Sequence, residues 1–180
     1  MSEALQALYA GDPDKARELL PPDGELSVFE AAAFGRLERL KEILDEDPSQ
    51  ARAFADDGFT ALHLAVFAEQ DDAARLLLER GADVNVRSTG AVVRVPPLGT
   101  AAFVRSTRLA GVLLDAGADV NAQGEGGFTA LHAAAQNGDE ALVRLLLERG
   151  ADPALANDRG ETPRDLASDA RVRAFLRAGG

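Results

Sequence analysis

The 180-residue chain contains no cysteine and no tryptophan, and it has only two histidines. The absence of cysteine excludes disulfides, thiolate nucleophiles and cysteine-ligated zinc, and it leaves the redox compartment open. Long apolar runs are also absent, because none approaches the roughly 20 residues of a membrane span. The first residues show no basic segment followed by an apolar stretch. We therefore expect no secretory signal and a cytoplasmic protein.

Basic charge is scarce relative to acidic charge. Thirty acidic and nineteen basic side chains give a formal net charge of −11. Such a field repels phosphate backbones and anionic membrane surfaces, so we expect neither nucleic acid nor membrane as a partner. Residues 1–87 carry a net charge of −10 and residues 88–180 a net charge of −1. We expect this asymmetry to steer a protein partner whose surface is basic or bipolar.

Two segments of the sequence occur more than once, which indicates internal repeats. Residues 58–65 read GFTALHLA and residues 127–134 read GFTALHAA. The leucine-rich segment at 75–85 returns in part at 144–152, and a related copy lies at 111–121. Because several residue types recur in one order, the repetition is specific.

Glycines that follow the leucine-rich segments give the period. Gly117 and Gly150 are 33 residues apart, whereas Gly81 and Gly117 are 36 apart, so three residues are inserted there. A glycine at this position suits the left-handed backbone that ends a helix. Thr60 and Thr129 each precede an apolar segment, where we expect helix N-caps.

Each copy contains two short apolar segments at helical spacing. Leu62, Ala65 and Val66 form one apolar face, and Leu76–Leu78 form the next. Neither segment can bury its face alone, whereas stacked copies can. The pattern therefore predicts stacked helix pairs with a core of leucine and alanine.

These motifs resemble the ankyrin repeat, which has a turn, a Thr-Pro-Leu-His-x-Ala signature, two short helices and Gly-Ala-Asp-Val-Asn leading into the next turn. The resemblance covers roughly residues 25–178, and residues 94–126 depart most from it, with Pro96-Pro97-Leu98-Gly99 in place of the signature. It implies an all-α ankyrin-repeat solenoid of stacked helix pairs with hairpin-like turns and two helical caps. We expect an N-terminal helical cap over 1–24, a divergent unit 1 over 25–57, unit 2 over 58–90, unit 3 with an extended turn over 91–126, unit 4 over 127–159 and a C-terminal cap over 160–180.

The two histidines, His63 and His132, occupy the same repeat position. The resemblance implies that their imidazoles bridge backbone groups of neighbouring turns, so they are not expected to act in acid–base chemistry. The glycines at 124–127 fall in a repeat turn, not in a phosphate-binding loop. Acidic runs such as Asp45–Asp47 lack calcium-loop spacing. We therefore expect no catalytic residues, no metal and no cofactor.

The resemblance further implies that a protein partner contacts the turn tips and the exposed side of the first helices, along a concave face. The expected exposed positions are Ala33/Phe34, Phe67/Ala68, Phe103/Val104 and Gln136/Asn137. Phe34, Phe67 and Phe103 should line up, flanked by the turn residues Phe59, Val95 and Phe128. The alternative is that these rings fold between neighbouring units and belong to the core.

The stretch 87–97 lengthens one turn and is a second candidate, because Arg87, Arg94, Arg105 and Arg108 collect nearby in an otherwise acidic molecule. A neutral insertion that extends a hairpin is the alternative. The predicted partner-binding residues are Phe34, Phe59, Phe67, Arg94, Val95, Phe103, Val104, Arg105, Phe128, Gln136 and Asn137.

The function predicted from the sequence is non-enzymatic binding of another protein by a monomer. One alternative is a structural protein that self-associates as a homodimer through the row of Phe34, Phe67 and Phe103. Another is a small enzyme, which would need a titratable cluster in a cleft.

Overall fold

The structure is a computed structural model that describes residues 1–90 and 93–178. The chain divides into two compact units. Unit A comprises Met1–Asp83 with Ser88–Val92, and unit B comprises Val84–Arg87 with Val93–Gly180. Ala91 and Val92, which belong to the predicted insertion, lie outside the described residues.

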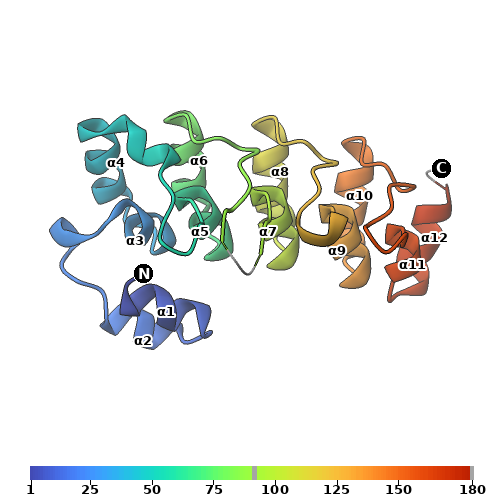
Figure 1. The fold of residues 1–180 in the computed structure, drawn as a ribbon, viewed down its shortest axis with the longest axis horizontal. Helices are drawn as coiled ribbons and strands as arrows, with labels where there is room; N and C mark the ends of the chain where they lie inside the picture. The colour runs from blue at the N-terminus through green and yellow to red at the C-terminus, as the bar shows by residue number, and fades with distance from the viewer. Residues whose placement is uncertain (91–92, 179–180) are drawn as a thin grey trace. The chain divides into compact units, whose positions relative to one another are not determined.

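Helices connected by turns make up both units (Figure 1). The helices of unit A are α1 (Glu3–Tyr9), α2 (Pro13–Glu18), α3 (Val28–Ala33), α4 (Leu37–Glu46), α5 (Ala61–Phe67) and α6 (Asp71–Glu79), with the 3-10 turns η1 (Asp23–Glu25) and η2 (Pro48–Arg52). The helices of unit B are α7 (Pro97–Phe103), α8 (Thr107–Asp115), α9 (Ala130–Gln136), α10 (Glu140–Glu148), α11 (Pro163–Leu166) and α12 (Ala170–Ala178), with the 3-10 turn η3 (Glu125–Gly127).

Consecutive helices form pairs, and neighbouring pairs stack within each unit. In unit A, α3 packs on α5 and α4 on α6, and in unit B, α7 packs on α9 and α8 on α10. The predicted all-α architecture of stacked helix pairs is confirmed. Each predicted range holds one helix pair, while the boundaries of the ranges stay predictions.

Four first helices begin with a capping box, in which the N-cap side chain and the residue three positions later satisfy each other's backbone N–H groups. The pairs are Ser27/Glu30, Thr60/His63, Thr129/His132 and Thr162/Asp165. Helix α7 departs from this pattern, as its sequence does. Its N-cap is Pro96 without a side-chain hydrogen bond, and Gly99 stands where the histidine would be. A Cβ on Gly99 would lie 2.5 Å from Cγ2 of Val95, so a larger residue there would require Val95 to shift.

Turns are tied to their neighbours by asparagine side chains at one repeat position. In unit B, Nδ2 of Asn121 donates to the Gly150 carbonyl at 3.3 Å, and Oδ1 accepts from the Asp152 N–H at 2.8 Å. One repeat earlier, Asn85 makes the equivalent two bonds, to the Gly117 carbonyl and from the Asp119 N–H. These bonds account for the recurrence of asparagine at this repeat position.

The core consists of leucine and alanine, as predicted. Leu62, Leu77, Ala65, Ala101 and Ala134 are all fully buried. The small alanine side chains let helices approach closely, while the leucines fill the space between stacked pairs. The predicted helix-ending glycines Gly81, Gly117 and Gly150 have φ of +84°, +91° and +87°, which only glycine adopts readily.

Candidate functional site

His132 has both of its ring nitrogens engaged by backbone or capping groups. Its Nδ1 accepts from the Thr129 backbone N–H at 3.2 Å, and the Thr129 hydroxyl lies 2.8 Å from the same atom. An acceptor nitrogen carries no hydrogen, so Nε2 holds the proton and donates it to the Glu161 carbonyl at 3.0 Å. Burial lowers the pKa of His132, although the Glu161 carbonyl bond and the Glu161 charge partly offset it. The predicted bridge between turns is confirmed for this residue.

His63 has the same arrangement at its Nδ1. The Thr60 N–H donates to Nδ1 at 3.3 Å, and the Thr60 hydroxyl lies 2.8 Å away. The ring is 1% exposed. Both imidazoles are therefore built into helix N-termini, and neither faces the surface.

The predicted aromatic residues of unit A lie under the N-terminal helix α1. Leu5 of α1 forms a buried cluster with Ala33 of α3 and Leu64 of α5. Tyr9 packs its ring edge-on against Phe67, with 5.3 Å between centroids, and lies 6.3 Å from Phe59. Phe34 packs against the same cluster, and these phenylalanines are half-buried.

Ala33 was expected to be exposed, and this expectation is wrong. It is 2% exposed because Leu5 packs against it. Ala68 is half-buried at the same cluster. These positions were expected to face a partner, but a segment of the chain itself covers them.

Carboxylates line one edge of this covered surface. The Tyr9 hydroxyl donates to Oδ2 of Asp57 at 3.0 Å, and the Met1 ammonium donates to Oδ2 of Asp56 at 2.8 Å. The latter bond lowers the pKa of Asp56. Glu30 is 7% exposed; burial opposes its charged form, but hydrogen bonds from Ser2 and Ser27 outweigh burial and lower its pKa. The edge therefore favours groups that donate hydrogen bonds or carry positive charge.

In unit B, the predicted residues at the ends of the first helices are accessible. Phe103 ends α7 and is 71% exposed. Arg105, two residues later, is exposed and has a left-handed φ of +59°. Gln136 and Asn137 at the end of α9 are exposed as well, and Asn137 donates to the Ala102 carbonyl at 3.4 Å. That bond joins the end of α9 to the end of α7, where Phe103 follows Ala102.

Most of the remaining predicted residues are less exposed to solvent. Arg94 is exposed, whereas Val95 and Val104 are half-buried. Phe128 is half-buried, with its ring centroid 5.4 Å from that of His132. For Phe128 the core alternative therefore holds in part, because the ring covers a capping histidine.

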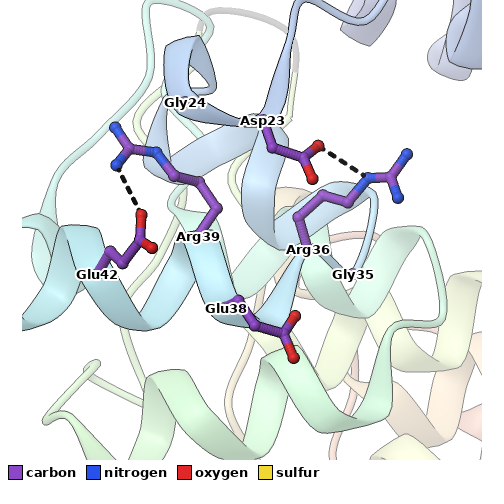
Figure 2. A pocket seen from close by; sticks show the side chains of 7 residues that line it. All are labelled: Asp23, Gly24, Gly35, Arg36, Glu38, Arg39 and Glu42. Atoms are coloured by element: carbon purple, nitrogen blue, oxygen red, sulfur yellow. Dashed lines mark hydrogen bonds and ion pairs between the residues drawn. The ribbon is translucent and has the colours of Figure 1, made fainter.

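A hollow of about 370 Å³ lies at the start of α4 in unit A (Figure 2). It is lined by Asp23, Gly24, Gly35, Arg36, Glu38, Arg39 and Glu42. Arg36 pairs with Asp23 at 3.7 Å and Arg39 with Glu42 at 3.2 Å, as the dashed lines in Figure 2 show. Each guanidinium has a carboxylate partner, while the third carboxylate, Glu38, leaves the lining with a small excess of negative charge.

Among the described residues, no group of three or more histidine, aspartate or glutamate side chains is arranged to hold a metal ion. The same part of the chain contains no helix that is both long and apolar enough to cross a bilayer.

The side chains of α1 that contact the aromatic surface were not among the predicted residues. Leu5, Leu8 and Tyr9 follow a helical i, i+3, i+4 spacing, which indicates an apolar face. This signal was present in the sequence, but the spacing does not say which surface the face covers.

Comparisons with known proteins agree with the fold. A family model described as ankyrin repeats (three copies) matches residues 1–88, and one described as ankyrin repeats (many copies) matches residues 113–167. The chain is 44% identical over 124 residues to the human B-cell lymphoma 3 protein, which covers 67% of this chain and 26% of that protein. It is 36% identical over 166 residues to the ankyrin repeat and SAM domain-containing protein 6 of Rattus norvegicus, which covers 92% and 14%.

The fission yeast palmitoyltransferase akr1 is also similar, at 36% identity over 142 residues, covering 79% of this chain and 22% of that protein. The chain thus spans about a quarter or less of the length of these relatives, and the activity in that name belongs to that protein. Ankyrin repeats generally serve as protein-interaction modules, and both matching models describe such repeats. With matches in both halves, capping boxes at the signature threonines and stacked helix pairs, the chain belongs to the ankyrin repeat family.

Proposed function

We propose that this chain is a non-enzymatic domain that binds another protein through the exposed side of its first helices and its turn tips. The observation that carries the proposal is Phe103, a large apolar side chain that is 71% exposed at the end of α7. The preceding residue, Ala102, accepts a hydrogen bond from Asn137, and Arg105 and Gln136 are exposed near the ends of the same two helices. An aromatic anchor with an arginine and amides around it has the composition of a binding hot spot.

A rigid scaffold supports this function because it presents side chains without ordering them on binding. Phe103 and Asn137 end helices that are packed on each other, and the capping box fixes the start of α9. The acidic charge of residues 1–87 favours a partner with a basic surface, mainly by raising the association rate.

The non-enzymatic assignment is supported by the two histidines. Each imidazole serves a capping box, and His132 also bonds to the Glu161 carbonyl, so these rings are occupied with structural roles. The cytoplasmic location and the monomeric state stay predictions.

The proposal is tested by affinity capture from an extract of the native host, with the native chain and two variants as baits. Phe103→Ala removes the proposed anchor. Phe54→Ala is the matched control, since Phe54 is a second exposed phenylalanine, at 44%, outside the predicted set. We expect a captured protein to be lost with Phe103→Ala and kept with Phe54→Ala. Equal capture by both variants would remove Phe103 from the binding surface.

The exposure of Phe103 also favours self-association as a second candidate function. Two copies could bury this ring against each other, in which case the protein would be a homodimer. Sedimentation equilibrium of the native chain and of Phe103→Ala distinguishes the two. A native chain that stays monomeric up to the highest soluble concentration rejects self-association.

A further inference from the structure

Part of the first-helix surface is already occupied by a helix of the same chain. In unit A, α1 lies across the ends of α3 and α5 (Figure 1) and buries Leu5 to 3% exposure against Ala33 and Leu64. Tyr9 fills the space between Phe59 and Phe67. The equivalent surface of α7 in unit B leaves its phenylalanine exposed, whereas the phenylalanines under α1 are half-buried.

We propose that α1 is a displaceable intramolecular ligand, and that the partner binds unit A with an amphipathic helix that takes the place of α1. This inference rests on the proposed protein-binding function and names the partner segment that unit A accepts. The predicted cap of residues 1–24 would then also control access to the surface.

The connection of α1 and α2 to the rest of unit A supports displacement. Helices α1 and α2 have seven and six residues, too few to be stable apart from the surface on which they pack. Residues 19–27, which include Pro21 and Pro22, connect them to α3 outside any α-helix. The helix pair can therefore leave without changing the stack of α3 and α4 on α5 and α6.

Polar contacts of α1 across the surface are few. Two of them are open to water, whereas the hydrogen bond from Ser2, the N-cap of α1, reaches the buried Glu30. The Tyr9–Asp57 hydrogen bond is part-buried, and the Met1–Asp56 ion pair joins a 27% exposed ammonium to an 89% exposed carboxylate. Exposed ion pairs contribute little to stability. The packing of Leu5 and Tyr9, together with the Ser2–Glu30 hydrogen bond, therefore provides most of the attachment.

The contacts of α1 also define the chemistry of the competing helix. Its apolar side must present an aliphatic and an aromatic residue four positions apart, as Leu5 and Tyr9 do. Its edge should carry lysine or arginine, since Asp56 and Asp57 accept a cation and a hydrogen-bond donor there. A basic amphipathic helix meets both requirements and agrees with the acidic charge of this half of the chain.

The test uses the absence of cysteine from the chain. Ala68→Cys places a single thiol under α1, and Ala133→Cys on α9 places a half-buried control thiol in unit B. The rate of reaction with a maleimide is measured for each full-length chain, with and without Leu5→Asp plus Tyr9→Ala to release α1. Hydrogen exchange of the α3–α6 amides reports whether the stack remains folded.

We expect release of α1 to speed labelling of the thiol at position 68 at least tenfold, with the thiol at position 133 and the α3–α6 amides unchanged. A synthetic peptide of residues 1–24, at millimolar concentration, should slow labelling at position 68 in the released chain and have no effect at position 133. In the chain with native α1, adding Leu77→Ala should leave the labelling rate at position 68 unchanged, because opening is local.

Three results would overturn the inference. The first is that the α3–α6 amides lose their protection from hydrogen exchange both in the Leu5→Asp, Tyr9→Ala variant and in the milder Tyr9→Phe variant. That result would make α1 an integral part of the stack. The second is a labelling rate at position 68 that rises with Leu77→Ala as global stability falls. The third is no protection by the peptide. No step of this test involves an unknown partner. The labelling test and the Phe103-dependent capture can therefore fail independently of each other.

Discussion

The Tyr9 hydroxyl donates a hydrogen bond to Oδ2 of Asp57 at 3.0 Å and so joins α1 to the turn that precedes α5. Burial raises the pKa of Tyr9, and the charge of Asp57 and this hydrogen bond raise it further. Because the protonated form is favoured only when α1 is docked, the stabilisation is complete below the ordinary tyrosine pKa of about 10 and is lost as pH rises above it. Tyr9 is the single tyrosine of the chain, so its ionisation can be followed without interference.

We predict that tyrosinate absorbance in the native chain develops well above pH 10. Asp57→Asn should move the midpoint down partially, since burial remains, and Leu5→Asp should return it to about 10 by releasing α1. Spectrophotometric titration measures all three chains. A native midpoint near 10 would mean that Tyr9 is not held in this environment.

His132 gives the stability of the protein a dependence on pH near neutrality. Its pKa is lowered by burial in the folded chain, whereas the unfolded chain titrates near 6.5. Below pH 6.5 the unfolded state therefore binds more protons, and the free energy of unfolding falls until the pH passes the folded pKa. Urea unfolding at pH values from 7.5 to 5.5 should show this fall, and His132→Gln should reduce it. An equal slope in the variant would assign the effect to other groups.

The core and the proposed binding surface should respond differently to truncation. Leu77 is fully buried, so Leu77→Ala should cost about 2–5 kcal/mol through the cavity it leaves. Phe103→Ala should stay within about 0.5 kcal/mol, as expected for an exposed side chain. Denaturant unfolding of both variants tests this. A large cost for Phe103→Ala would place its ring in the core, as the alternative interpretation holds.

The asparagine bonds between turns should contribute measurably to stability. Asn121→Ala removes two hydrogen bonds, to Gly150 and Asp152, and we predict a loss of about 1–2 kcal/mol. The exposed amide Gln136 provides the control, since Gln136→Ala should change stability by less than about 0.5 kcal/mol. Thermal unfolding followed by circular dichroism compares them, and equal effects would contradict a role for Asn121 in joining the turns.

Much of the fold could be predicted because the repeat encodes it locally. Thr60 and Thr129 cap helices as expected. The leucines that recur at equivalent repeat positions, such as Leu77 and Leu146, identify the buried face of the second helices. Each of these features depends on residues a few positions apart or on the next copy of the same motif. The role of Asn121 could have been found in the same way, from the recurring Val-Asn pair.

The covered surface of unit A could not be predicted by that route. Residues 1–24 do not repeat the full unit, so the period does not determine where α1 packs. Leu5 and Tyr9 reveal an apolar face, but its partner surface is assembled from α3, α5 and the turn at Phe59, which are far away in the sequence. The outcome for Phe34 and Phe67 depends on this tertiary contact, not on the helix positions that they occupy.

The most direct test of protein recognition by this domain is site-specific photo-crosslinking. A benzophenone amino acid replaces Phe103 in one chain and Phe54 in another, and each is irradiated in extract of the native host. We predict an adduct with a distinct protein, identified by mass spectrometry, from position 103 and not from position 54. The same adducts from both positions, or adducts only with a second copy of this chain at position 103, would contradict recognition of another protein through this surface.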